Sequence, residues 1–148
     1  MKNTVWIFLL LISLTACKND KTSTSEKSTE TTHEYVESEE DLELNDGQKW
    51  FVNEEMKPFV KAGEERVEKY IKEKKGDYKS LAAQLTEHNN QLIKSCTMTG
   101  KSHDELHKWL HPHLELVAEL GKAEKPGDAD QIIEKIDKSY ATYHQFFQ

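Results

Sequence analysis

Apolar residues that recur every three or four positions constrain the fold of this chain more than any other feature. From about Leu42 to Gln148 this helical spacing returns in four segments, and no stretch alternates apolar and polar residues as a half-buried strand does. Short connections between long amphipathic helices favour antiparallel neighbours. The pattern therefore predicts one all-α domain over 42–148, an antiparallel up-down-up-down four-helix bundle.

Each predicted helix carries one apolar stripe that should face the core. The stripes consist, in chain order, of Met56, Val60, Gly63, Val67, Tyr70 and Ile71; of Leu81, Leu85, His88, Leu92 and Cys96; of Leu106, Leu110, Leu114 and Val117; and of Ile133, Ile136, Tyr140, Tyr143 and Phe147. Two aromatic pairs, Trp50-Phe51 and Phe146-Phe147, flank the bundle in sequence and are expected to cover the same end of it.

Polar residues and glycines indicate where the helices begin and end. We expect the first helix to begin near Asn53 and to close at residues 74–76, and the second to begin after Asp77 and stop at Gly100. Pro112 predicts a kink or a short break at His111. Two pairs have the spacing of a capping box and should open the third and fourth helices: Ser102 with Glu105, and Asp128 with Gln131.

The first seventeen residues have the layout of a signal peptide. Lys2 precedes an apolar run from Val5 to Leu14, which is too short to cross about 30 Å of hydrocarbon as a helix. Small Ala16 stands directly before Cys17. The segment is therefore predicted to direct export rather than to anchor the chain as a transmembrane helix.

Leu14-Thr15-Ala16-Cys17 resembles the lipobox of bacterial lipoproteins. The resemblance implies that Cys17 becomes the mature N-terminus, carries acyl chains such as palmitate, and holds the protein on the extracytoplasmic side of a bacterial membrane, in the periplasm or elsewhere in the cell envelope. An ordinary signal peptide cut nearby would give the same compartment. The stretch HNNQLIKSCTMTGKSHDELHKWLHPH is also similar to small flavobacterial-type lipoproteins, a resemblance that implies no particular function.

Residues 18–41 form a Ser/Thr- and Glu-rich linker that is predicted to be disordered, because so polar a segment cannot bury enough apolar surface to offset its chain entropy. The whole chain has 20 basic and 27 acidic residues; taking away Lys2 with the signal peptide leaves 19 basic residues and a net charge of −8. Such a charge argues against nucleic acid as a partner. It leaves lipid on Cys17 as the expected membrane attachment.

The two cysteines have different predicted fates. If Cys17 carries lipid on its sulfur, it cannot pair with Cys96, which is then a lone thiol in a compartment that oxidises thiols. A lone thiol of this kind is buried and inert, bonded to another chain, or a metal ligand.

The predicted topology brings several soft ligands to one end of the bundle. The start of the first helix, the turn between the second and third, and the end of the fourth all lie at that end. We expect a metal site there made of Cys96, Met98, His103 and His107, with Met56 and His144 as additional ligands. His103 and His107 are four residues apart and share a helix face. Thiolate, thioether and imidazole together suit copper, and thiolate with imidazole alone suits zinc.

Each of these residues also has a plain structural interpretation. Met56 can simply pack, His88 can bond a neighbour, and His144 can lie favourably against a helix dipole. On a helical wheel His111 is rotated away from the core, whereas His113 falls nearer to it. A protein without metal, serving as a structural or protein-interaction lipoprotein of the envelope, is therefore the alternative interpretation.

Two further resemblances are partial. His103, His107 and His113 have the histidine spacing of the metzincin protease motif, but Asp104 and Leu110 stand where that motif has its glutamate and glycine. The general base is missing, and no other catalytic pattern is present, so we predict that the protein is not an enzyme. Met56 with His144 is similar to the axial ligand pair of periplasmic four-helix haem-b cytochromes, which implies haem as an alternative cofactor.

Overall fold

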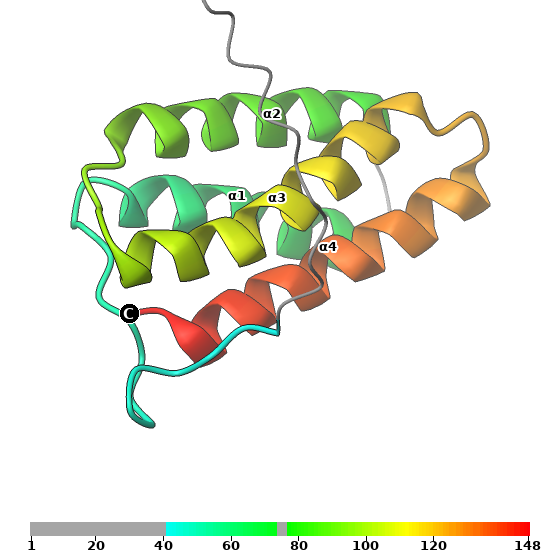
Figure 1. The fold of residues 1–148 in the computed structure, drawn as a ribbon. Coiled ribbons are helices and arrows are strands. Elements are labelled where there is room, and N and C mark those ends of the chain that lie inside the picture. Colours follow the sequence, from blue (N-terminus) through cyan, green and yellow to red (C-terminus); the bar gives the residue numbers. More distant parts are fainter. Residues whose placement is uncertain (1–40, 74–76) are drawn as a thin grey trace, which may run out of the picture. The chain divides into compact units, whose positions relative to one another are not determined.

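The computed structural model describes residues 41–73 and 77–148, which contain four helices: α1 (Lys57–Glu73), α2 (Tyr78–Ser95), α3 (Lys101–Lys122) and α4 (Pro126–Phe146). Each helix packs against the next one along the chain, and α4 closes onto α1 (Figure 1). Within the described residues the β-structure consists of isolated bridges. The predicted all-α, up-down-up-down bundle is confirmed. The predicted signal peptide, the lipid on Cys17, residues 18–40 of the linker and the helix closure at 74–76 lie outside the described residues.

The apolar stripes of the sequence form most of the core, but Ile71 of the first stripe is 38% exposed, and Tyr70 and Leu114 are only half-buried. Leu85 of α2, Leu106 of α3 and Ile136 of α4 have at most 1% of their surface exposed, and Val67 of α1 has none. The second stripe is displaced from its predicted position. The buried positions of α2 are Leu81, Ala82, Leu85, Asn89 and Leu92, so Asn89 takes the place expected for His88, which is half-buried.

The start of α1 differs from its predicted position, whereas the start of α2 agrees with it. Residues 54–56 form a turn, and α1 begins at Lys57 rather than near Asn53. Instead, Asn53 joins the chain to the α2–α3 connection: its Nδ2 donates to the carbonyl of Ser95, and its Oδ1 accepts from the amide of Thr97. The predicted cap at Asp77 is confirmed, since its carboxylate accepts from the Lys79 amide at 2.9 Å.

Neither predicted capping box forms. Gly100 does not stop α2, which ends at Ser95; it is the residue before α3, with φ +68°, and no side chain caps that helix. Glu105 is turned away to other partners described below. The fourth helix begins at Pro126, a favourable first helical residue, with Lys125 before it. Local spacing was misleading here because α3 and α4 begin before Ser102 and Asp128, so neither residue stands at an N-cap.

The helix α3 runs without a break through Pro112, so the predicted interruption at His111 is wrong. Pro112 lies on the exposed side of the helix, where water can hydrate the carbonyl that loses its intrahelical N–H donor. The continuity fixes the directions of the residues on both sides of the proline. His111 lies half-buried toward the surface, and His113 points into the core with none of its surface exposed.

Residues 50–52 pair with the end of the chain and cover one end of the bundle. The Trp50 amide donates to the carbonyl of Phe146 at 2.7 Å, and the Gln148 amide donates to the carbonyl of Trp50 at 2.9 Å. Trp50 and Phe147 are buried, as expected, whereas Phe51 is 72% exposed. This end also carries the first turn of α1 and the α2–α3 connection, so the bundle brings together the elements on which a site was predicted.

Gly63 allows α1 and α4 to approach closely. A Cβ at this position would overlap the hydroxyl of Tyr140 and lie 3.2 Å from its Cζ. We expect Gly63→Ala to lower the free energy of unfolding by about 1–3 kcal/mol, because overpacking outweighs the gain in helix propensity. Tyr140→Phe in the same chain should restore part of the loss. The matched control is Gly121→Ala, whose Cβ would meet only the Cβ of Ala82 at 3.8 Å and which should be neutral or stabilising. Urea unfolding compares these three variants with the parent chain; a stabilised Gly63→Ala protein would contradict the expected overlap with Tyr140.

Candidate functional site

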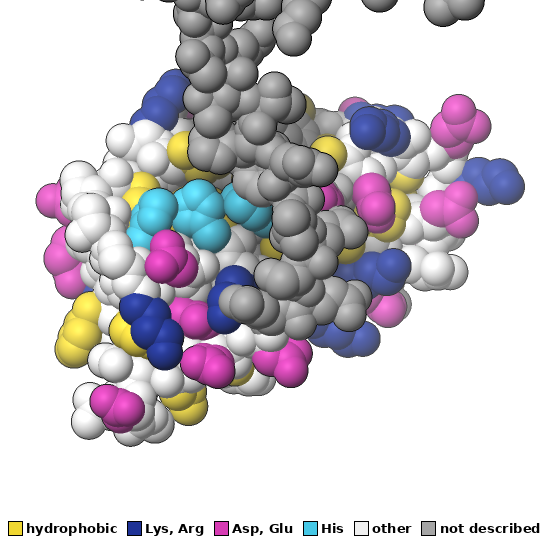
Figure 2. Space-filling view, viewed as in Figure 1, with side chains coloured by type: hydrophobic (Ala, Val, Ile, Leu, Met, Phe, Trp, Pro, Cys, Tyr) yellow, Lys and Arg dark blue, Asp and Glu magenta, His cyan; other side chains and the backbone are white. Residues whose placement is uncertain are grey.

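Three histidines follow one another along α3 at intervals of four residues and so share one face of the helix. The Nε2 atoms of His103 and His107 are 3.1 Å apart, and Nδ1 of His107 is 2.9 Å from Nε2 of His111. All three side chains are half-buried. Figure 2 shows histidine side chains gathered in one patch, which in this view lies along the edge of α3 toward α2. We call these three residues the histidine row.

Ring nitrogens form the short contacts within the row, so the positions of the protons on these nitrogens matter. Each short N···N contact needs one proton between its two nitrogens. His107 contributes both of its nitrogens, and as a neutral ring it donates to one neighbour and accepts from the other. Burial lowers the pKa of His107 below its ordinary value, and the neighbouring His103 and His111 lower it further. The neutral ring, which is the form that binds metals, is therefore favoured at the centre of the row.

The spacing of His103 and His107 fits two ligands of one ion. At metal–nitrogen distances of about 2.0–2.1 Å, two nitrogens 3.1 Å apart subtend an angle of about 100° at the metal. This angle is close to that of a tetrahedral centre and far from that of a linear one. The pair can thus occupy two adjacent positions of an ion and leave the others for further ligands.

The predicted sulfur ligands lie on the connection that leads into α3. Cys96 is a free cysteine at the C-cap of α2, half-buried, and its side chain and that of Met98 pack against the core. Among residues 41–73 and 77–148, no three His, Cys, Asp or Glu side chains are already grouped as a metal site. The structure therefore brings His103 and His107 together, while Cys96 remains a predicted ligand.

The two additional ligands have other surroundings. Met56 is 1% exposed and belongs to the core. His144 is committed to Glu64 of α1, with Nε2 2.9 and 3.0 Å from the two carboxylate oxygens. The pair lines a cavity of about 380 Å³ between α1 and α4, together with Lys57, Val60, Lys61, Tyr143, Phe147 and Gln148.

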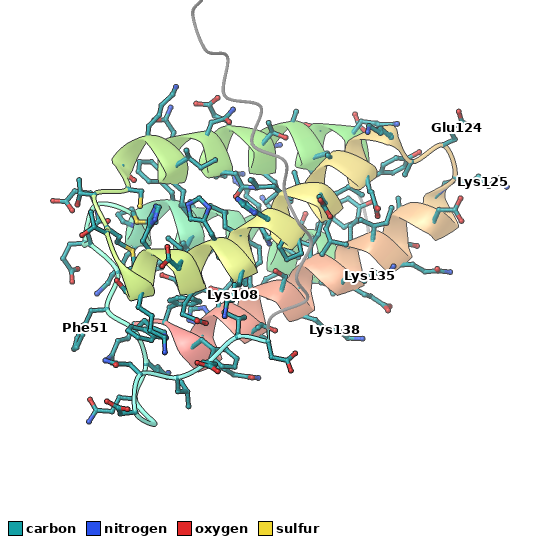
Figure 3. All side chains as sticks on the ribbon, in the orientation of Figure 1. Phe51, Lys108, Glu124, Lys125, Lys135 and Lys138 are labelled. Atoms are coloured by element: carbon teal, nitrogen blue, oxygen red, sulfur yellow. The ribbon has the colours of Figure 1, made fainter. Side chains whose placement is uncertain are left out.

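Glu105, predicted to belong to a capping box, is a buried charge. It is 2% exposed, and its two carboxylate oxygens accept from the Glu43 amide at 2.8 Å and from the Lys108 ammonium at 2.9 Å. Burial alone would raise the pKa of Glu105, but these two partners outweigh it, and the pKa lies below its ordinary value. Lys108 is labelled on α3 in Figure 3. The carboxylate thus ties residues 41–50 to the helix that carries the histidine row.

His113 lies in the core, on the side of the helix to which the helical wheel assigned it. Its ring stacks on Trp109 with centroids 4.9 Å apart, and its edge meets Tyr140 at 4.7 Å. Nδ1 lies 3.0 Å from Oγ of Ser139, and the buried Nε2 has no hydrogen-bond partner. Burial lowers the pKa of His113 to about 4. Its position three residues after Leu110 and four before Val117 puts it on the buried face of α3.

No protein-family model, curated protein or solved structure matches the chain. No helix in the described part of the chain is long and apolar enough to span a membrane. A functional conclusion therefore has to come from the geometry of the side chains.

Proposed function

We propose that this protein binds a soft or borderline metal ion, with copper favoured over zinc, through His103 and His107. The observation that supports the proposal is the 3.1 Å separation of their Nε2 atoms on one helix face. Cys96 is the proposed thiolate ligand and Met98 the thioether, while Met56 and His144 are reserve ligands. The role we propose is sensing, buffering or transfer of the ion, with no catalysis.

The ligand chemistry favours copper. Imidazole binds zinc and copper alike, whereas a thioether is a ligand for Cu(I) rather than for Zn(II). The angle of about 100° at the histidine pair leaves room for two more ligands in a tetrahedral arrangement. Cys96 and Met98 lie five to seven residues before His103, on the connection at the same end of the bundle. An ion held by side chains of half-buried residues would remain accessible for delivery and removal.

The cellular setting forms part of the proposal. The lipobox-like Leu14-Thr15-Ala16-Cys17 would place the protein in the bacterial cell envelope, anchored by lipid on Cys17. A copper site suits this compartment, since metal ions that enter the cell pass through the envelope before they reach the cytoplasm. The competing proposal is a structural lipoprotein that binds an envelope partner and no metal, and haem is the weaker alternative cofactor because His144 is already paired with Glu64.

Metal titration tests the proposal directly. The chain with Cys17→Ser, which leaves Cys96 as its one thiol, should bind about one equivalent of Cu(I) in competition with a chromogenic chelator. His103→Ala and His107→Ala should each weaken binding by more than about 100-fold, the upper end of what loss of an outer-shell partner costs, because each removes a direct ligand. Cys96→Ser tests the thiolate, and Zn(II) titration tests the preference for copper.

The matched control is His88→Ala, which removes a half-buried histidine on α2 outside the histidine row and should leave Cu(I) binding unchanged. Unchanged Cu(I) affinity in the His103→Ala, His107→Ala double variant would overturn the proposed site. A Soret band after adding haem, lost in Met56→Ala or in His144→Ala, would favour the haem alternative instead.

A further inference from the structure

His111 is the member of the histidine row that the proposed metal site does not use. It lies one helical turn beyond His107, and its Nε2 is 2.9 Å from Nδ1 of His107. It is half-buried, so this contact is partly shielded from water. A short contact of this kind between two ring nitrogens is a hydrogen bond whose proton belongs to one ring or the other.

A metal on Nε2 of His107 decides which ring holds that proton. Metal binding needs the lone pair on Nε2, so the proton of a neutral His107 must be on Nδ1. From there it can donate to Nε2 of His111. Histidines that bind metals almost always donate their second ring N–H to an acceptor, which fixes the tautomer and the ring orientation and makes the ligand more basic.

We infer that His111 is a positioning residue that accepts the Nδ1–H of His107 and so holds the His107 ring in the tautomer and orientation in which Nε2 binds the metal. This inference rests on the proposed function. His111 itself does not contact the ion in this arrangement, because its Nε2 is occupied by the proton of His107. The row therefore has a division of roles, with two ligands and one supporting acceptor on three successive turns of α3.

The alternative is that His111 is a third ligand. The nitrogen of His107 that faces His111 is Nδ1, whereas the nitrogen that faces His103 is Nε2. One ion cannot lie between His103 and His107 and also between His107 and His111, because the two contacts are on opposite sides of the His107 ring. The connectivity of the row thus favours the positioning role over direct ligation.

Two substitutions separate these roles. His111→Gln keeps a side-chain oxygen that can accept from Nδ1 of His107, and His111→Leu keeps bulk without an acceptor. In the Cys17→Ser chain, His111→Leu should weaken Cu(I) and Zn(II) binding by about 10- to 100-fold, and His111→Gln should restore most of that loss. Affinity in His111→Leu equal to that of the parent chain overturns the inference, and so does a loss in His111→Gln as large as that in His107→Ala.

Nitrogen NMR of histidine-labelled protein measures the tautomer of His107 directly. A merely structural role of His111 would leave this tautomer unchanged. In the Zn(II)-loaded parent chain, His107 should carry its proton on Nδ1, and a coupling across the hydrogen bond should link this nitrogen to His111. His111→Leu should abolish the coupling. In the metal-free chain the same coupling tests the hydrogen bond between His107 and His111 independently of metal binding. If the parent chain shows the coupling but takes up no metal, the proposed function is wrong. If it takes up metal without showing the coupling, the role inferred for His111 is wrong.

Discussion

Replacing Phe147 by alanine is expected to lower the free energy of unfolding by about 3–5 kcal/mol, the cost of emptying the space of a large core side chain. Phe147 follows the last turn of α4, yet it is only 1% exposed. Its ring stacks on Tyr143 with centroids 5.3 Å apart and lies 6.4 Å from Trp109. The loss should be large because this ring closes the core at the end that carries the proposed metal site.

The control for this prediction is Phe51→Ala, which removes the same side chain from a position that is 72% exposed and labelled at that end of the molecule in Figure 3. It should change stability by no more than about 0.5 kcal/mol. Urea unfolding followed by circular dichroism measures both variants. Equal small losses in the two proteins would show that residues 50–52 and 147–148 do not belong to the cooperative unit.

The fold could be predicted from the sequence because it depends mainly on apolar residues that recur at helical spacing. Four apolar stripes with helical spacing leave few ways to bury them, and all the buried positions of α4 except Ala129 were predicted. The helix ends were less predictable, since an end depends on which side chain reaches which backbone group. Asn53 illustrates this: it resembles a helix start, but in the structure it links the α2–α3 connection to the segment before α1.

The candidate site was predictable only to the extent that its geometry is local. A spacing of four residues along one helix places His103 beside His107 whatever surrounds that helix. The orientation of Cys96 depends on a connection of irregular backbone, and no periodic rule governs it. The contact of His107 with His111 was missed because Pro112 suggested a break, and the continuity of α3 reverses that conclusion.

The burial of His113 predicts that the protein loses stability in mild acid. In the unfolded chain the ring has its ordinary pKa of 6.5, whereas in the core burial lowers the pKa to about 4. The unfolded state therefore binds a proton in a pH range where the folded state does not. This penalty is absent above about pH 6.5, grows as the pH falls, and reaches about 3 kcal/mol near pH 4, since each pKa unit corresponds to 1.36 kcal/mol.

Two variants with different packing isolate this effect. His113→Leu removes the titrating ring and fills the space with an apolar group, and His113→Gln keeps a polar group within reach of Ser139. The two proteins will differ in stability at pH 7.5, but both should lose about 3 kcal/mol less than the parent chain between pH 7.5 and pH 4, because neither can bind the extra proton on unfolding. Urea unfolding of the metal-free proteins across this range gives the comparison at constant ionic strength. If both variants keep the pH dependence of the parent, the acid sensitivity originates elsewhere, and His113 is not held neutral by its burial between Trp109 and Tyr140.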